Sequence, residues 1–251
     1  NDEHVSKLIQ QIQAEKSDLI KSRKIKNTKF PSFLTEDEKS FGLPVGWEWA
    51  PLGIIGNIFN GNSISTRIKE EKYTNSEGIP FIATKDVGYG FEILDYDNGI
   101  SIPIKEPKFK TAHAGSVLIC AEGGSAGRKM GRINQDICFV NKLFAITPEN
   151  ETTSKYLFYW YNTDEFQGEF KSRLTGLIGG VSKKKFETIP IPIPPHNEQK
   201  HIVAKLVECY EFIDKARANV EKNLNNAKEL FQSQLNQIFS NGVHSEILFK
   251  N

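Results

Sequence analysis

Two segments of this 251-residue chain combine glycine and serine with basic side chains that follow closely. In the first, residues 123–125 precede Arg128 and Lys129, and in the second, residues 176–182 precede Lys183. Basic side chains attract phosphate by charge, while small residues let the backbone approach and donate N–H groups. An arginine can also contact the edge of a guanine through two N–H groups. These residues therefore favour the binding of phosphates and bases.

Positive charge is concentrated around both segments, although the whole chain has a formal net charge of only +1. Residues 105–135 carry six basic and two acidic side chains, and residues 167–190 carry five and two, which leaves local net charges of +4 and +3. Charge alone fits two solvated basic faces as well as it fits a nucleic-acid interface. The candidate DNA-binding residues, chosen by local charge and neighbouring glycines, are Arg67, Lys85, Lys110, Arg128, Lys129, Arg132, Arg173 and Lys183.

Signatures of catalysis are scarce in the sequence. No P-loop pattern is present, and the glycine run at 122–129 lacks the Lys-Ser/Thr pair of a nucleotide-binding loop. The five histidines show no metal-ligand spacing with one another or with a cysteine, and no nucleophile-elbow motif appears. We therefore expect no catalytic residue, no metal site and no cofactor in this chain.

The composition is that of a globular protein of one or two domains, with 38% hydrophobic and 25% charged residues. This apolar fraction and the low net charge exclude a disordered chain. No apolar run approaches the roughly 18 residues of a membrane span, and the polar residues 1–10 do not resemble a signal peptide. Cys120, Cys138 and Cys209 are scattered, which predicts free thiols in a reducing compartment.

Residues 47–195 alternate between short strand-like runs and turns. One helical stretch, 154–171, interrupts this pattern. The block ends in residues 189–195, where alternating prolines predict an extended connector that continues neither a sheet nor a helix. The β-branched and aromatic runs that predict strands lie at 79–83, 116–121 and 137–140.

The strongest structural signal is a helix over residues 196–240. Its apolar residues recur at alternating steps of three and four over about five heptads, if Arg217 and Gln234 occupy two of the seam positions. Six basic and six acidic side chains make the helix electrically neutral, which favours packing over phosphate binding. A seam this long needs a second helix, from this chain or from another. The predicted seam residues are Val203, Leu206, Tyr210, Ile213, Val220, Leu224, Phe231 and Ile238.

The remaining segments complete the predicted domain organisation. Residues 1–26 predict a shorter amphipathic helix, 27–46 a linker, 47–195 a β-rich domain, 196–240 the long coiled-coil helix and 241–251 a tail. The fold class expected from this order is α+β.

Three motifs resemble the specificity subunits of type I restriction–modification systems. Residues 43–49, Leu-Pro-x-Gly-Trp-x-Trp, are similar to the entry of the family's target-recognition domain, and residues 115–127 to its central strand and glycine turn. The most specific match is residues 189–203, where alternating Ile and Pro precede Glu-Gln-Lys-x-Ile-Val, as at the family's exit into a long conserved helix. Residues 13–29 also resemble the end of its spacer helix, so the matches cover nearly the whole chain.

The resemblance implies a non-catalytic subunit that reads one half of a bipartite target on double-stranded DNA. It implies that the long helix docks a methyltransferase (modification) subunit, which would bind S-adenosylmethionine, and that a restriction/translocase subunit joins the complex. It also implies a prokaryotic, cytoplasmic protein.

The resemblance covers half of the family's usual pattern, which has two recognition domains separated by two antiparallel helices. The chain is then either the C-terminal half of a longer subunit, with a second recognition domain, or a half-size subunit that forms a homodimer. A self-paired form would be two-fold symmetric and would read a palindromic split site.

Two other interpretations stay open at this point. A metal-dependent nuclease or DNA-modifying enzyme acting alone could use a Glu-x-Lys triplet on a strand to hold a metal ion, with Glu70 and Lys72 or with Glu169 and Lys171. Such triplets are frequent in a chain this charged. A coiled-coil scaffold with a β-rich cap would have no salt-dependent affinity for DNA.

Overall fold

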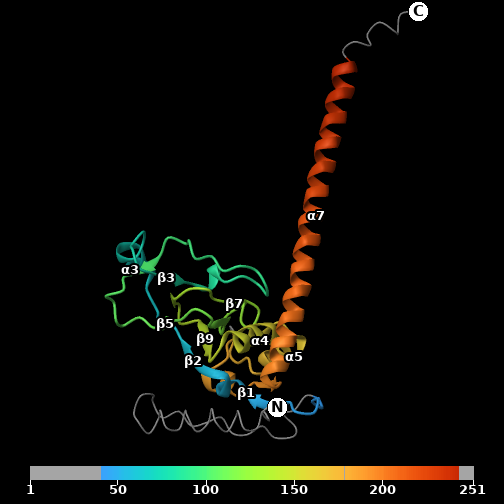
Figure 1. Cartoon of the computed structure of the whole chain (residues 1–251). Helices are drawn as coiled ribbons and strands as arrows, with labels where there is room; N and C mark the ends of the chain where they lie inside the picture. Colours follow the sequence, from blue (N-terminus) through green and yellow to red (C-terminus); the bar gives the residue numbers. More distant parts are fainter. Residues whose placement is uncertain (1–40, 178, 243–251) are drawn as a thin grey trace, which may run out of the picture. The chain divides into compact units, whose positions relative to one another are not determined.

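The computed structural model describes residues 41–177 and 179–242 (Figure 1). The helix predicted at 1–26, residues 27–40 of the predicted linker and residues 243–251 of the predicted tail lie outside the described residues, and residues 241 and 242 of that tail belong to the long helix. The described part is α+β and ends in a long helix, which confirms the predicted fold class. Its strands are β1 (Glu48–Pro51), β2 (Gly56–Asn60), β3 (Ile79–Ile82), β4 (Ser101–Ile102), β5 (Thr111–Ala112), β6 (Val117–Cys120), β7 (Met130–Arg132), β8 (Ile137–Phe139), β9 (Leu143–Pro148) and β10 (Pro190–Ile193). Its helices are α2 (Leu52–Ile55), α3 (Thr66–Lys72), the 3₁₀ turn η2 (Thr84–Asp86), α4 (Glu151–Tyr161), α5 (Asp164–Ser172), α6 (Lys183–Glu187) and α7 (His196–Gly242).

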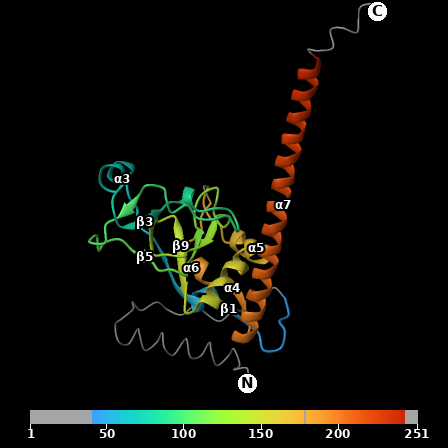
Figure 2. The same ribbon diagram turned by 45° about the horizontal axis from the view of Figure 1, so that its top comes forward.

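Two four-stranded sheets form the body of the β-rich part. One has the order β2-β9-β6-β7, with every neighbouring pair antiparallel. The other has the order β4-β3-β8-β5, in which β3 and β8 run parallel. Strand β5 lies beside β9 of the first sheet (Figures 1 and 2). The three strand-like runs of the sequence form β3, β6 and β8.

A hydrophobic core lies between the two sheets. Strands β6 and β9 contribute Leu118 and Ala145 to it, and strands β3 and β8 contribute Ile82 and Phe139. All four residues of β6 are buried, which explains why this strand is a continuous apolar run instead of an alternating one. The core fixes both ends of the β6–β7 hairpin, and the turn of this hairpin carries the first glycine motif.

Helices α4 and α5 replace the single helix predicted over residues 154–171, so this prediction was wrong. Thr163 lies between them, and its hydroxyl donates to the carbonyl oxygen of Trp160 (2.8 Å) at the end of α4. The same hydroxyl oxygen accepts from the backbone N–H of Phe166 (3.2 Å) and thereby caps α5. A threonine that offers the backbone these local bonds competes with helix continuation. The two helices remain in contact, because the Phe166 ring stacks on Tyr161 at 4.4 Å between centroids.

Strand β10 corrects the interpretation of the proline-rich run as a connector outside any sheet. It pairs antiparallel with β1, so that Glu48 lies opposite Ile193 and Pro51 lies opposite Pro190. A strand with one neighbour needs backbone donors only at alternate residues, so prolines fit at the other positions. The pair joins the entry and the exit of the β-rich domain.

Helix α7 is continuous over 47 residues, about 70 Å at 1.5 Å per residue (Figure 1). The chain divides into two compact units between His201 and Ile202, so the first turn of α7 belongs to the β-rich unit. No helix within the described residues is long and apolar enough to cross a bilayer.

In the first turn of α7, Gln199 keeps only 2% of its surface exposed. Its Nε2 donates to the carbonyl oxygen of Pro194 (3.0 Å), and its Oε1 accepts from the hydroxyl of Thr153 on α4 (3.1 Å). The glutamine of the exit motif therefore ties the proline-rich strand end to α4.

The predicted seam remains largely exposed along the second unit. Val203 is buried, and Leu206 and Tyr210 are half-buried. The five apolar seam residues that follow keep between 52% and 66% of their surface exposed: Ile213, Val220, Leu224, Phe231 and Ile238. The pairing of this seam with another helix stays a prediction.

Candidate nucleic-acid interface

The glycine turn at residues 123–129 joins β6 to β7 and is held tightly by its own backbone. The N–H of Ala126 donates to the carbonyl oxygen of Gly123 (2.9 Å), and the N–H of Gly127 donates to the carbonyl oxygen of Cys120 (2.8 Å). Gly127 adopts a φ of +74°, and a Cβ at this position would lie 2.5 Å from the ring of Phe170 on α5. Only glycine fits here without strain. Arg128 follows Gly127 directly and lies at the surface.

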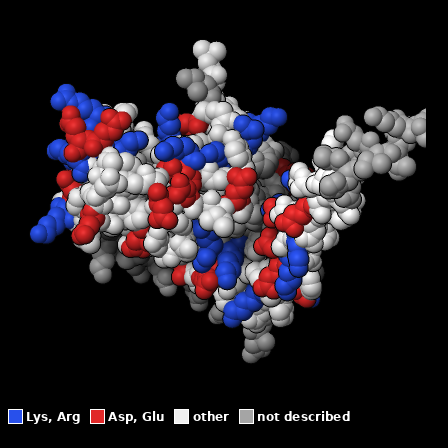
Figure 3. Space-filling view, turned by 90° about the horizontal axis from the view of Figure 1, so that it is seen from above, with Lys and Arg blue, Asp and Glu red and all other residues white. Residues whose placement is uncertain are grey.

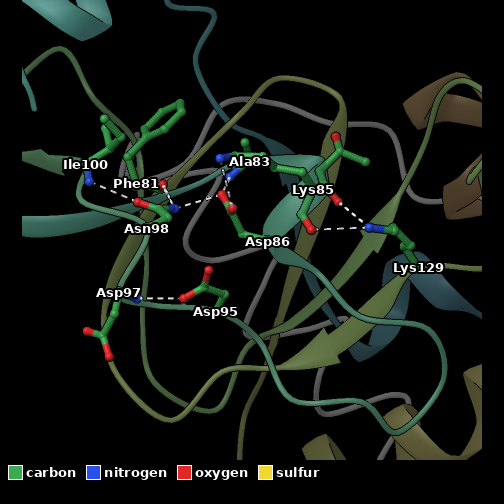
Figure 4. A network of polar contacts seen from close by, with 10 residues as sticks. Phe81, Ala83, Lys85, Asp86, Asp95, Asp97, Asn98, Ile100 and Lys129 are labelled. Atoms are coloured by element: carbon green, nitrogen blue, oxygen red, sulfur yellow. Dashed lines mark hydrogen bonds and ion pairs between the residues drawn. The ribbon is translucent and has the colours of Figure 1, made fainter.

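A second loop, residues 83–98, is closed by a buried carboxylate (Figure 4). Oδ2 of Asp86 accepts from the backbone N–H of Ala83 (2.8 Å) and from Nδ2 of Asn98 (2.7 Å). Asn98 also donates to the carbonyl oxygen of Phe81 in β3 (2.9 Å). Because the Asp86 carboxylate is hydrogen-bonded to both ends of the loop, it restrains the backbone of the residues between them.

The two loops meet at Tyr89. Lys129 Nζ lies 5.2 Å from the centroid of the Tyr89 ring, and Arg128 Cζ lies 5.7 Å from it. Nζ of Lys129 also donates to the carbonyl oxygens of Thr84 (3.1 Å) and Lys85 (3.3 Å), as drawn in part in Figure 4. We refer to Tyr89, Arg128 and Lys129 as the aromatic–cationic cluster. Lys85 adjoins the cluster through its backbone carbonyl, and its own ammonium group lies 3.8 Å from Oδ1 of Asp86.

The aromatic–cationic cluster has the chemistry that nucleic acids select. Tyr89 and Arg128 are exposed, as is the adjoining Lys85, and Lys129 is half-buried. Cations attract phosphates, and an exposed aromatic ring offers a face to a base or to a guanidinium.

A third segment, in which Thr175 and Gly180 form a bridge, lies next to the glycine turn. The N–H of Gly123 donates to the carbonyl oxygen of Gly179 (2.8 Å), and Glu122 forms a bridge with Gly180. A cavity of about 520 Å³ opens between these segments, with Lys142 at its edge. The two glycine motifs of the sequence are therefore neighbours in space.

The remaining predicted DNA-binding residues lie on other elements and have partners within the domain. Arg67 pairs with Glu71 on α3 (2.7 Å), and Nζ of Lys110 donates to the carbonyl oxygen of Asn60 (2.8 Å). Neither residue belongs to the aromatic–cationic cluster.

Arg132, Arg173 and Lys183 also make intramolecular contacts. Nε of Arg132 donates to the hydroxyl of Ser154 (2.9 Å), beside a cavity of about 460 Å³ at the other end of the β6–β7 hairpin. Arg173 forms an ion pair with a glutamate on α5, and Lys183 forms one with a glutamate on α6 (3.3 Å). Contact between these eight candidate residues and DNA stays a prediction.

Sequence reasoning missed two side chains of this region, Tyr89 and Lys142. Tyr89 is flanked by Gly88 and Gly90, and an aromatic residue between two glycines is a signal of a loop tip that could have been used. Lys142 follows β8 without a neighbouring basic residue, so only the tertiary structure brings it to the second glycine motif.

Charge is mixed across the face drawn in Figure 3. Lys and Arg side chains are interspersed there with Asp and Glu, and no extended area of one sign dominates. An interface with DNA would therefore depend on local clusters, since the overall field of the chain is weak.

The two Glu-x-Lys triplets lie in helices, which removes the basis of the nuclease interpretation. Glu70 and Lys72 lie on α3, and Glu169 and Lys171 lie on α5, whereas the metal-binding arrangement needs a strand. Among the described residues, no three His, Cys, Asp or Glu side chains come together as a metal site would require.

The two core cysteines are poorly suited to act as nucleophiles. Burial raises the pKa of the Cys120 thiol and that of the Cys138 thiol. Both thiols therefore stay protonated at neutral pH, and a protonated thiol is a poor nucleophile.

Comparison with known proteins gives a consistent result. The family model described as "Type I restriction modification DNA specificity domain" matches residues 44–226. The chain is 30% identical over 244 residues to the type I restriction enzyme EcoAI specificity subunit of Escherichia coli and 28% identical over 250 residues to the EcoEI specificity subunit of the same organism. Each match covers 94% of this chain and 40% of the relative, so the chain spans about two fifths of the length of these relatives.

Two solved structures share the fold. One, from a study of complex assembly and conformational transition of the type I R-M system, superimposes with a TM-score of 0.62 at 24% identity, over 94% of this chain and 54% of that chain. The HsdS subunit from Thermoanaerobacter tengcongensis superimposes with a TM-score of 0.52 at 24% identity, over 84% and 47%.

Proposed function

Because the chain belongs to the family of type I restriction modification DNA specificity domains, we propose that it is a DNA sequence-recognition subunit or one half of such a subunit. Its β-rich domain reads one half of a bipartite target on double-stranded DNA. The chain supplies recognition, and the reaction steps belong to partner subunits.

The observation that carries this proposal is the aromatic–cationic cluster. A short glycine turn and a loop closed by the Asp86 carboxylate bring two cationic side chains and one aromatic ring together at the surface. Loops that are held this firmly retain their geometry when DNA binds, so less binding free energy is lost to ordering them.

The exposed seam of α7 supports the second half of the proposal, which concerns partners. The row of apolar side chains from Ile213 to Ile238 would be covered by the helix of a second recognition unit, from a second copy of this chain or from the other half of a longer protein. The helix also docks a methyltransferase subunit, which binds S-adenosylmethionine, and a restriction/translocase subunit completes the complex. Such an assembly works in the prokaryotic cytoplasm.

Selection of DNA duplexes from a random-sequence pool tests the recognition proposal. We expect the purified full chain to enrich one motif, and its affinity to fall steeply as salt rises, because phosphate contacts release counterions. Lys85→Glu should lower the affinity and reduce the salt slope by about one. Lys222→Glu makes the same charge change on α7 and should leave both nearly unchanged.

Two outcomes would contradict the proposal. A selection without enrichment of any motif, combined with an affinity that does not depend on salt, would favour a coiled-coil scaffold. Cleavage of the duplex by the chain alone in the presence of Mg²⁺ would instead favour a nuclease.

A further inference from the structure

Arg128 and Lys129 are adjacent in sequence, but their side chains make different contacts in the structure. Nζ of Lys129 donates to two backbone carbonyl oxygens, those of Thr84 and Lys85, and lies over the ring of Tyr89. Its ammonium group therefore bridges the glycine turn and the second loop. Lys129 is half-buried and is best suited to holding the two loops together.

Arg128, in contrast, is exposed and held at two points. Within the described residues, its guanidinium has one hydrogen-bond partner, the carbonyl oxygen of Gly124, to which Nη2 donates. Its planar group also lies over the Tyr89 ring at 5.7 Å. This hydrogen bond uses one of the five N–H groups of the guanidinium, so the group retains enough donors for two further parallel hydrogen bonds.

On the premise of the proposed function, we propose that Arg128 determines specificity by reading a guanine in the half-site, and that Tyr89 is its positioning residue. Two parallel N–H donors of an arginine match O6 and N7 of guanine in the major groove, and no other base offers two acceptors in that arrangement. The Gly124 carbonyl and the Tyr89 ring fix the orientation of the guanidinium in the absence of DNA. The side chain of Arg128 therefore loses less rotamer freedom on binding than an unrestrained arginine would.

A selection that compares the wild-type chain with Arg128→Lys tests the assignment. Lysine keeps the charge but lacks the planar pair of parallel donors, so a phosphate contact would survive the change while the contact with guanine would be weakened. We expect the wild-type motif to contain a guanine preferred by roughly 5- to 150-fold, and this preference to fall severalfold in Arg128→Lys at that one position. The remainder of the motif and the salt slope should stay unchanged.

Tyr89 provides a second and independent comparison. Tyr89→Phe keeps the ring under the guanidinium and removes only the hydroxyl, which lies 3.4 Å from Ser125 Oγ. Tyr89→Leu removes the ring and should weaken the guanine preference severalfold, whereas Tyr89→Phe should keep it. Tyr89 is 46% exposed, so both variants should keep the wild-type thermal unfolding midpoint.

The outcomes separate this inference from the proposed function. If the wild-type chain enriches a motif and Arg128→Lys enriches the same motif with the same guanine preference, the inference is wrong and the proposed function stands. A loss of affinity in Arg128→Lys that is uniform across all sequences, with the guanine preference retained, would likewise overturn the inference, because it would show that Arg128 does not discriminate between bases. If the wild-type chain enriches nothing, the proposed function itself fails.

Discussion

At the scale of single residues, the glycine turn shows how one backbone position supports a loop surface. Gly127 combines a left-handed φ with a close approach to the buried ring of Phe170. Gly124 has neither constraint, since no atom lies within 4 Å of the place that the methyl group of an alanine would take there. The two glycines of one motif therefore differ in what they contribute to the fold.

Gly127→Ala should destabilise the domain by about 1–3 kcal/mol, because alanine is strained at this φ and its Cβ collides with Phe170. Gly124→Ala is the matched control and should change the free energy of unfolding by less than about 0.5 kcal/mol. Urea unfolding followed by circular dichroism measures both values. Equal losses in the two variants would contradict the structural distinction between these glycines.

At the scale of elements, a surface carboxylate links the end of β5 to the start of β8. Asp136 accepts from the ring of His113 (3.0 Å) and from the backbone N–H of Ala114 (2.9 Å). The hydrogen bond from His113, together with that from Ala114, lowers the pKa of the Asp136 carboxyl below its ordinary value of 3.8. The ionised form of Asp136 is therefore the form that the fold stabilises.

This shift predicts a pH dependence of stability with a definite sign. Because the pKa of Asp136 is lower in the folded than in the unfolded chain, its contribution is fully present above about pH 4 and is lost as the pH falls through the folded value. Asp136→Ala should therefore cost stability at pH 7, by less than about 1 kcal/mol because the pair is exposed, and should cost less at about pH 2.5. Thermal unfolding at the two pH values checks this expectation, and a larger cost at the lower pH would refute it.

At the scale of the whole molecule, the long helix predicts a partner. Helix α7 leaves a row of apolar side chains exposed over most of its length, and we expect another helix to cover this row. The neutral charge balance of the helix fits packing better than DNA binding.

If two copies of this chain pair through the predicted seam, Leu224→Asp should weaken their association at least about tenfold, since burying a leucine contributes about 1.5–3 kcal/mol and an aspartate cannot replace it. Asn225→Asp adds the same charge one residue along, outside the predicted seam, and should leave the association constant nearly unchanged. Sedimentation equilibrium measures both. Identical losses in the two variants would place the contact surface elsewhere on α7.

Much of the architecture could be predicted from the sequence, because its signals are local. The heptad pattern predicts α7 and the β-branched runs predict β3, β6 and β8, since the periodicity of side chains already defines which face is buried. Of the two exceptions, one is local and one is not. Thr163 divides one predicted helix through its own hydrogen bonds, whereas the prolines of β10 form a strand because β1, far away in the sequence, pairs with it.

The composition of the candidate binding surface was decided by the tertiary structure. The sequence by itself determined which residues could carry positive charge, and its motifs determined the family. It could not determine that Tyr89 lies under Arg128, that Lys129 turns toward two carbonyl groups, or that the two glycine motifs adjoin, because these contacts join residues about 40 to 55 positions apart. The orientation of a long flexible side chain depends on the residues that the fold brings close to it, and the neighbouring sequence does not specify those residues.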